Sequence, residues 1–425
     1  MLTTGDVIDA AIEKPAAGGR MIARYEGQVL LVSGAIPGEH VSLRIDRVEK
    51  RLAFGTVVDV LKPSPDRREP GSDPLCGGCA YAHIDYSRQV LLKADIVADA
   101  LTRIGRIPLD GPVAIAASPE AGYRMRARLQ VAGQTFGFFR EHTHEICDPR
   151  QTRQLADASL DAVDQATAAL GEARTDVEAL ELSENMPGDQ RAIHLDVIPD
   201  ARSLVPALER ATAAAGLTGC SARGRLGPLV RVGNPAVGDS IAALTQNRVS
   251  SGQLRRQPTS FFQANRFLLP HLVVTVLDAV LPDDRVLDLY AGVGLFSVAL
   301  AAVGRDEITA VEGDRNSVAD LKENAASFAS AIRVIPGRVE DHVATQGQVT
   351  GTIIVDPPRT GISREAMDAI ATRGAMRIVY VSCDPPTMAR DARRLLDAGY
   401  RLDSLKGFDL FPNTPHVESV ALFTR

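Results

Sequence analysis

One cysteine in the sequence has the surroundings of a reactive thiol. In "IVYVSCDPPTMARD" (378–391), apolar and β-branched residues end at Ser382 and Cys383, and Asp384 and two prolines follow. A lone cysteine is most often a buried, inert thiol. Cys383 instead stands among serine, aspartate and proline at the carboxyl end of an expected strand, where a thiol can act as a covalent nucleophile.

A carboxylate that can serve as a base stands near the C-terminus. Glu418 lies in the polar beginning of the apolar run "HVESVALF". A positioned carboxylate can accept a proton during catalysis, although a glutamate is by default a solvated surface residue. His416 is a competing base candidate, unless it is a turn residue.

A glycine-containing turn indicates where a cofactor binds. "VLDLYAGVGLFSVAL" has the pattern of a strand, a turn with Gly292 and Gly294, and a helix. Glycine lets the backbone turn tightly and approach a ligand. A nicotinamide fingerprint would need a third glycine where Ser297 stands. With Asp288 before the turn and Glu312 at the end of the next strand, the pattern resembles the class I S-adenosylmethionine (SAM) fold.

These residues require a scaffold in which several strands end at one edge. From about residue 250, strand-like runs such as "RVLDLY", "EITAVEG", "GTIIVDPP" and "RIVYVSC" alternate with helical runs, which predicts a doubly wound, Rossmann-like parallel sheet. Asp356 then lies at the carboxyl end of a strand, where such folds bind ligands. Arg359 stands where amino-methyltransferases have an aromatic residue after the prolines, which counts against that related activity.

The rest of the chain predicts two further parts. Residues 1–62 alternate apolar and polar residues in short runs, which indicates a small OB-like β-barrel. Apolar residues at helical spacing predict one helix from about 86 to 107. The resulting α/β and α+β chain has three expected domains: a barrel (1–62), a middle α+β domain (75–85 and 112–249) and a SAM-dependent domain (86–111 and 250–425).

Composition excludes several classes of protein. The 425 residues contain no apolar run long enough to cross a bilayer and no basic-then-apolar leader, so we expect a soluble, cytoplasmic protein without a membrane partner. Five unevenly spaced cysteines argue against a disulfide framework. A net charge of −6 does not indicate nucleic-acid binding, but net charge is a poor guide to local fields.

Six segments resemble one enzyme family in their order and spacing. They are "PTSFFQAN", "LDLYAGVG", "VEGD", "DPPRTG", "YVSCDPPTMARD" and "HVES". The resemblance is to the RNA 5-methyluridine (uracil-C5) methyltransferases and extends over nearly the whole chain. It is closest to the branch that methylates 23S ribosomal RNA, because the N-terminal barrel looks like a TRAM domain. It implies transfer of a methyl group from SAM to C5 of a uridine in RNA.

The resemblance also implies roles for individual residues. Cys383 corresponds to the nucleophile, which adds to C6 of the uracil, and Glu418 corresponds to the base that removes the C5 proton. Uracil C5 is too weakly nucleophilic to take a methyl group unaided, and thiolate addition makes it an enolate carbon. The positions that contact SAM correspond to Gln263, Tyr290, Glu312 and Asp356. Leu295 stands at the place of a SAM-contacting asparagine, so that contact is not carried over.

The cysteine pair of "CGGCAYAHI" raises the question of a metal cluster. In the ribosomal RNA branch, four cysteines bind an iron–sulfur cluster of the 4Fe-4S type. Three of them correspond to Cys76, Cys79 and Cys147. The fourth place holds Pro70, with Ser72 and Asp73 as the nearest oxygen-bearing candidates. A cluster with a non-cysteine fourth ligand and a glycine-rich turn without metal both stay open. A Cys76–Cys79 disulfide is the least favoured reading.

Two short stretches are candidates for RNA contacts. Arg124, Arg126 and Arg128 in "YRMRARLQ" share one face of an expected strand, which suggests a phosphate-binding row. Phe261 and Phe262 are either base-stacking or core residues.

Two other functions stay open beside methylation of 23S ribosomal RNA. One is methylation of transfer RNA, which the N-terminal barrel disfavours. The other is a non-catalytic RNA-binding or assembly protein, which the presence of both Cys383 and Glu418 disfavours. We expect RNA as the partner and no obligate protein partner.

Overall fold

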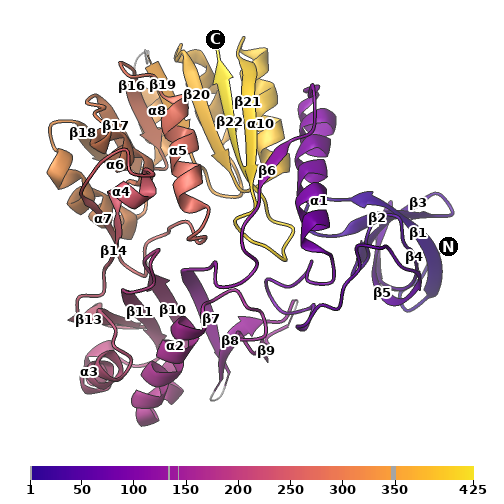
Figure 1. Cartoon of the computed structure of the whole chain (residues 1–425), viewed down its shortest axis with the longest axis horizontal. Helices are drawn as coiled ribbons and strands as arrows, with labels where there is room; N and C mark the ends of the chain where they lie inside the picture. The colour runs from indigo at the N-terminus through magenta and orange to yellow at the C-terminus, as the bar shows by residue number, and fades with distance from the viewer. Residues whose placement is uncertain (1, 133–134, 142, 346–350) are drawn as a thin grey trace.

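The computed structural model describes residues 2–132, 135–141, 143–345 and 351–425. They form a mixed α/β structure with a closed barrel and two large sheets, which confirms the predicted fold class (Figure 1). Within these residues, no helix is long and apolar enough to cross a membrane.

The N-terminal strands close into a barrel, as their short alternating runs predict. In the order β1-β2-β3-β5-β4, the strands are β1 (Val7–Pro15), β2 (Met21–Tyr25), β3 (Gln28–Ser33), β5 (Leu52–Lys62) and β4 (His40–Val48). Inward residues such as Leu30, Val32, Leu43 and Ile45 are fully buried. Every second side chain therefore points into the barrel and its neighbours face outward.

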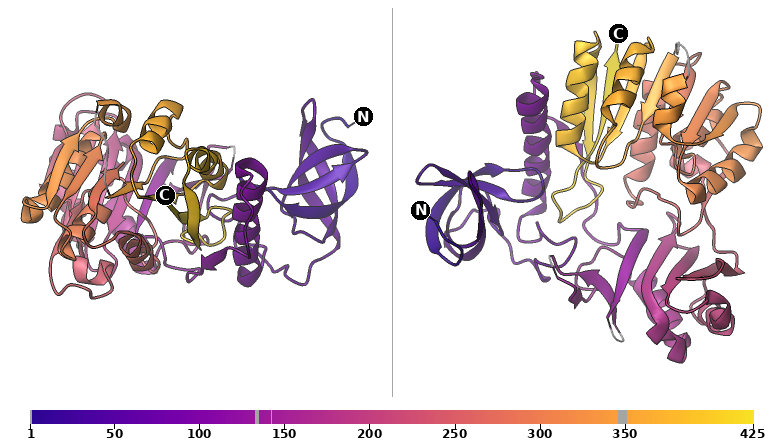
Figure 2. Two further views of the ribbon diagram at one scale, coloured as in Figure 1. Left: turned by 90° about the horizontal axis from the view of Figure 1, so that it is seen from above. Right: turned by 180° about the vertical axis from the view of Figure 1, so that it is seen from behind.

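A helix connects the barrel to the C-terminal sheet. Helix α1 (Tyr86–Asp99) begins at Asp85, whose side chain accepts a hydrogen bond from the Ser87 amide, and continues as a π-helical turn (Ala100–Gly105). Leu92 packs into the barrel core and Val97 into the core of the C-terminal sheet. The helix thus lies between the two parts, as both views of Figure 2 show.

A seven-stranded sheet forms the middle of the chain. Its order is β13 (Val230–Gly233), β12 (Gly219–Gly224), β11 (Arg191–Val197), β10 (Val177–Glu184), β7 (Arg126–Ala132), β8 (Thr135–Phe139) and β9 (Ile146–Cys147). Helices α2 (Asp157–Ala169) and α3 (Val205–Ala214) contribute to its core. The short pair β14 (Val237–Ser240) and β15 (Gln253–Arg256), with α4 (Ile241–Leu244), leads to the C-terminal sheet.

The C-terminal sheet is doubly wound, as the alternating pattern predicts. Its order is β18 (Ile332–Pro336), β17 (Ile308–Glu312), β16 (Arg285–Leu289), β19 (Gly351–Val355), β20 (Arg377–Ser382), β22 (Glu418–Thr424), β21 (Arg401–Phe408) and β6 (Ala114–Ala116). Only β22 runs against its neighbours. The start of β22 therefore lies at the edge where the parallel strands end.

Two apolar cores cover the two faces of this sheet. One includes residues of α5 (Leu269–Ala279), α6 (Leu295–Ala302) and α7 (Arg315–Ala325). The other includes residues of α8 (Val339–Thr345), α9 (Arg364–Thr372), α10 (Pro385–Asp397) and α1. With both faces covered, the central strands are apolar on both sides, as β19 illustrates with five buried residues in "GTIIV".

Candidate active site

Strand register places Cys383 and Glu418 opposite each other. β20 and β22 pair antiparallel, and Ser382 opposite Ser419 is the last pair of their ladder. Cys383 directly follows Ser382 and Glu418 directly precedes Ser419, so both residues stand just beyond the last pair of this ladder. The candidate nucleophile and the candidate base thus meet at the ligand-binding edge of the sheet.

A cavity of about 1180 Å³ opens at this edge. It is lined by all the predicted catalytic and SAM-contacting residues: Gln263, Tyr290, Glu312, Asp356, Cys383 and Glu418. Gly18 of the barrel and Arg124 before β7 also line it, so every part of the chain contributes to its wall. Small-molecule pockets are typically about 300–1,000 Å³, so this cavity has room for more than one small ligand.

Burial and charge shift the pKa of both candidate catalytic groups. The Cys383 thiol is free and half-buried. Burial and the charge of Glu418 raise its pKa to about 11, and Arg359 acts in the opposite direction. Burial and the charge of Asp356 raise the pKa of Glu418 well above its usual range. Its Oε1 atom is buried without a hydrogen-bond partner among the described residues. The site thus holds a thiol and a carboxyl group whose pKa values are both raised by burial and by neighbouring negative charge.

The glycine turn and Glu312 form one hydrogen-bonded unit. The Glu312 carboxylate accepts hydrogen bonds from the Gly292 amide at 2.8 Å and the Asp314 amide at 2.6 Å. Gly292 has a φ of 58° and Gly294 one of 92°, values that glycine adopts without strain. Tyr290, directly after β16, also has a positive φ of 63°. Glu312, at the end of β17, therefore stabilises the conformation of the glycine turn at the cavity wall.

Two further buried carboxyl groups belong to strands next to the glycine turn: Asp288 lies in β16, and Asp356 directly follows β19. Burial raises the pKa of Asp356 to about 7, and Gln263 Nε2 lies 3.5 Å from one of its oxygens. Burial likewise raises the pKa of Asp288 to about 7. The Ser297 hydroxyl, at the place of the missing third glycine, donates to Asp288 at 2.5 Å. Ser297 is thus a structural partner of Asp288.

His416 also lines the cavity but is a poorer base than Glu418. Burial and the charge of Arg359 lower its pKa to about 4. Its ring packs edge-on against Phe411, with ring centroids 6.2 Å apart. A base with so low a pKa holds a proton weakly at neutral pH, whereas the pKa of Glu418 is raised.

The predicted phosphate-binding row stays a prediction, and its three arginines have partners within the protein. Arg126 and Arg128 pair with Glu181 at 3.1 and 2.8 Å. Arg124 donates to Gln154 at 2.7 Å and lies over Phe411. The acids come from neighbouring strands, which the local pattern does not reveal.

The two phenylalanines differ in exposure. Phe262 is buried in the core of the C-terminal sheet, whereas Phe261 is 62% exposed and lines the cavity. Phe261 therefore remains a base-stacking candidate.

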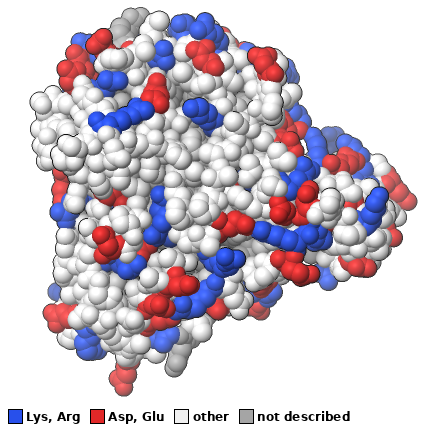
Figure 3. Space-filling view, viewed as in Figure 1, with Lys and Arg blue, Asp and Glu red and all other residues white. Residues whose placement is uncertain are grey.

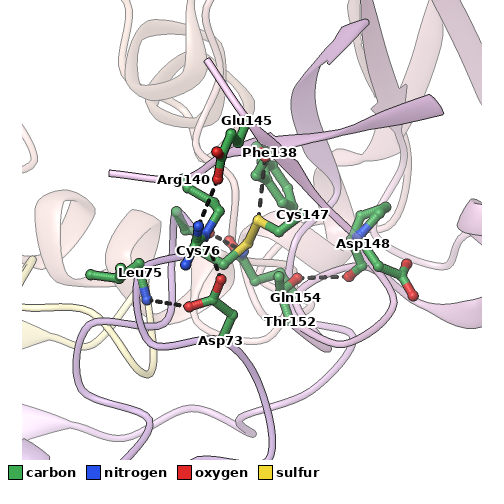
Figure 4. The surroundings of a disulfide bond; sticks show 12 residues. Asp73, Leu75, Cys76, Phe138, Arg140, Glu145, Cys147, Asp148, Thr152 and Gln154 are labelled. Carbon is green, nitrogen blue, oxygen red and sulfur yellow. Dashed lines mark hydrogen bonds and ion pairs between the residues drawn. A yellow bond between two sulfur atoms is a disulfide. The ribbon is translucent and has the colours of Figure 1, made fainter. Parts of the chain in front are cut away.

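The structure joins two of the three expected cluster ligands. Cys76 and Cys147 form a disulfide, shown in Figure 4, which corrects the expectation of a chain without one. Cys79 is free and buried. Asp73, a candidate fourth ligand, pairs with Arg140 at 2.6 Å.

These residues do not fit an iron–sulfur cluster as they stand. Two of the three sulfurs bind each other, while cluster iron needs free thiolates. No group of three or more histidine, cysteine or acidic residues able to hold a metal occurs in the described ranges. The predicted cluster is therefore not supported. Since the disulfide links segments 71 residues apart, the sequence offered no local signal for the pairing.

Sequence reasoning overlooked two contributors to the cavity. Arg359 entered the sequence analysis only as an argument against another activity. It nevertheless lines the cavity, and its positive charge acts to lower the pKa values of Cys383, His416 and Glu418. The connection between β21 and β22 supplies Phe411 and Thr414 to the wall, beside His416, which the sequence analysis had named as a candidate base. The "DPPRTG" motif contained the signal for Arg359, whereas the connection has no recognisable pattern.

Comparison with known proteins assigns the family. Residues 246–425 match the model of the tRNA (uracil-5-)-methyltransferase family, and residues 2–58 match the TRAM domain. The chain is 33% identical to a protein named 23S rRNA (uracil(1939)-C(5))-methyltransferase RlmD of Methylococcus capsulatus, covering 98% of this chain and 97% of the relative. The chain belongs to the RNA uracil-C5 methyltransferase family. It is thus a SAM-dependent RNA methyltransferase with an N-terminal TRAM domain.

Other relatives agree with this assignment. An uncharacterized RNA methyltransferase of Streptomyces coelicolor is 34% identical over 98% of this chain and 93% of its own. The crystal structure of Pyrococcus abyssi tRNA (uracil-54, C5)-methyltransferase with S-adenosyl-L-homocysteine has a TM-score of 0.76, at 23% identity, and covers 98% of this chain and 99% of the other. This similarity supports the fold of the uracil-C5 methyltransferases across the whole chain.

Proposed function

We propose that this methyltransferase modifies a uridine of 23S ribosomal RNA through a covalent bond between Cys383 and C6 of the base. The observation that carries the proposal is the register of β20 and β22, which brings Cys383 and Glu418 to opposing positions at one cavity. A nucleophile and a base beside a nucleotide-sized cavity are the groups that uracil-C5 methylation requires.

The reaction begins with the thiol. As the Cys383 proton leaves, the sulfur bonds to C6 and the electrons of the C5–C6 double bond move to C5 and O4. The pKa of about 11 means that a base must take the proton, and Glu418 and Asp356 line the same cavity. Arg359 favours the thiolate, because its positive charge acts against the rise in the pKa of Cys383.

Methyl transfer and elimination follow. SAM bound at the glycine turn would supply the methyl group to C5 and would be converted to S-adenosylhomocysteine. Glu418 then removes the C5 proton, the C5–C6 double bond forms again, and the bond from sulfur to C6 breaks. The buried Oε1 of Glu418, which has no hydrogen-bond partner within the described ranges, is the atom available for this proton.

The residues at the glycine turn suit SAM. We assign Glu312 to the ribose hydroxyls, and Gln263, Tyr290 and Asp356 to the rest of the cofactor. Three features support this assignment: the cavity position of these residues, the glycine turn held by Glu312, and the doubly wound edge. SAM would supply the methyl group and a positive charge beside Asp356 and Asp288.

The ribosomal substrate is inferred from relatives. Several, including those of Methylococcus capsulatus and Alcanivorax borkumensis, are named 23S rRNA (uracil(1939)-C(5))-methyltransferase. A ribosomal RNA substrate implies a cytoplasmic location. The target base must leave its stack to reach Cys383, which favours a loop or an extruded nucleotide.

Replacement of the base tests the mechanism. With Glu418→Gln, addition and methyl transfer proceed but the C5 proton stays, so labelled RNA should remain bound to the protein in a denaturing gel. Turnover should fall about 10²–10⁴-fold. Cys383→Ala should give neither adduct nor product. Release of methylated RNA by Glu418→Gln at the normal rate would exclude Glu418 as the base.

Mapping of 5-methyluridine tests the substrate. In RNA from cells with and without the protein, one 23S position should lose its methyl group. Loss confined to transfer RNA would overturn the ribosomal assignment and leave the chemistry intact.

A further inference from the structure

The connection between β21 and β22 is anchored through one residue, Asn413. Its side-chain Oδ1 accepts hydrogen bonds from Arg68 Nη2 and from Gln89 Nε2, both at 2.9 Å. Its backbone amide donates to Gln89 Oε1 at 2.8 Å, and its carbonyl accepts from the Tyr81 amide at 2.8 Å. Side chain and backbone of one residue are thus fixed together.

The partners of Asn413 come from the first quarter of the chain. Arg68 and Tyr81 belong to the segment between the barrel and α1, and Gln89 is a fully buried residue of α1. These partners are themselves fixed, because Arg68 pairs with Glu120 and Gln89 donates to the Tyr81 carbonyl at 3.1 Å. Acidic and basic side chains lie side by side where the barrel joins the rest of the molecule (Figure 3). Asn413 therefore ties the connection to a rigid, polar junction.

The backbone at Asn413 shapes the wall of the active-site cavity. Its φ of 63° lies in the left-handed region, which asparagine and aspartate adopt more readily than most other residues. The next residue, Thr414, closes the turn: its hydroxyl donates to the Phe411 carbonyl at 2.6 Å and accepts from the His416 amide at 3.2 Å. Phe411, Thr414 and His416 all line the cavity. The anchored turn therefore orients three side chains of the wall.

This wall lies between the barrel and the candidate nucleophile. Gly19 in the turn between β1 and β2 has a φ of 93°, and a Cβ atom there would lie 2.8 Å from Pro415 of the wall. On the cavity side, the charge of Arg359 acts on both His416 and Cys383. The anchoring contacts do not involve the glycine turn, where we place SAM. Displacement of the wall should therefore affect the RNA substrate and not the cofactor.

We propose that Asn413 is a positioning residue, which holds the wall from Phe411 to His416 in the shape that receives the target uridine. Asn413 acts through this wall and does not touch the reacting atoms. The segment after the barrel and α1 thereby contribute to the geometry of the active site. The inference rests on the proposed function for the identity of the substrate. A role of Asn413 in the stability of the fold alone is the alternative that the experiments test.

Two substitutions at Asn413 separate its hydrogen bonds from its backbone conformation. Aspartate retains an acceptor for Arg68 and Gln89, whereas glycine loses it, and both residue types adopt a positive φ. With a 23S ribosomal RNA transcript, Asn413→Gly should lower kcat/KM about 10- to 100-fold through a higher KM. Asn413→Asp should stay close to the wild type. Calorimetry should give the same Kd for SAM in all three proteins.

Hydrogen exchange of residues 409–417, followed by mass spectrometry, tests the anchor without a substrate. Exchange should be about tenfold faster in Asn413→Gly than in the wild type or in Asn413→Asp, because loss of the acceptor favours local opening. Equal exchange rates and equal kcat/KM in the two variants would overturn the proposal. A lower Tm of Asn413→Gly with unchanged kcat/KM would also overturn it, since the role would then be structural.

A variant of one partner keeps the test decisive if Asn413→Gly does not fold. Arg68→Gln removes one donor to Asn413, and it should raise KM for RNA and speed exchange of residues 409–417. Arg88→Gln, which breaks an ion pair with Asp66 at the same junction, is the control of equal charge change. Equal behaviour of the two arginine variants would overturn the proposal. If the wild-type protein does not methylate the transcript, the proposed substrate fails, while the exchange comparison still decides the anchor.

Discussion

At the scale of the residue, the raised pKa of Cys383 determines how reactive the proposed nucleophile is in the free enzyme. Burial and Glu418 raise this pKa to about 11, while Arg359 lowers it. Only the thiolate reacts with iodoacetamide, so alkylation of Cys383 in the free enzyme should rise about tenfold per pH unit from 7 to 9 without levelling. Arg359→Ala should slow alkylation at pH 8, and Glu418→Gln should speed it.

Mass spectrometry of the peptide that contains Cys383 measures this rate. Cys79 and Cys220 are buried and serve as internal controls in the same sample. A plateau in the alkylation rate below pH 8 would show that the thiol is already ionised in the free enzyme.

At the scale of the element, one buried ion pair anchors the connection between β21 and β22 (residues 409–417). Lys93 of α1 pairs with Asp409, both fully buried, and donates to the Phe411 carbonyl at 3.0 Å. This pair fixes the start of the segment that leads through His416 to Glu418. Lys93→Met leaves an uncompensated buried charge and should cost about 3–5 kcal/mol of stability. KM for RNA should rise, because the cavity wall loosens.

Urea denaturation and methylation kinetics measure these two effects. Lys14→Ala, which removes a half-exposed ion pair with Asp99, is the matched control and should cost below about 1 kcal/mol. Lys93→Met combined with Asp409→Leu should recover part of the loss. Equal stability of Lys93→Met and Lys14→Ala would mean that the buried pair does not hold the connection.

At the scale of the whole molecule, the Cys76–Cys147 disulfide ties the segment after the barrel to the middle sheet. It closes a loop of 71 residues at the wall of the cavity. In the chain-entropy account, such a cross-link stabilises by about 4 kcal/mol. Dithiothreitol should therefore lower the stability of the wild-type protein and leave that of Cys147→Ser unchanged.

A thiol count checks the same disulfide directly. Denatured, unreduced protein should show three free thiols, those of Cys79, Cys220 and Cys383. Five free thiols together with bound iron and sulfide in anaerobically prepared protein would contradict the disulfide.

Local patterns were sufficient for the architecture, and they proposed the residues of the candidate site. The barrel, the doubly wound sheet and the glycine turn follow from periodicity and from residues that act within one strand–turn–helix unit. Family motifs named the cavity residues one by one. These predictions succeed because backbone conformation and side-chain periodicity depend on neighbours a few positions away.

The tertiary structure alone decided which residues far apart in the sequence form ion pairs, disulfides or a common site. The register of β20 and β22 brought Cys383 close to Glu418. Pairing of β7 with β10 placed Glu181 where it forms an ion pair with Arg126. Packing of β9 against the segment after the barrel joined Cys76 to Cys147 in place of a metal site. Such pairings depend on the closure of long loops and on the packing of whole sheets, so residue types and local spacing do not determine them.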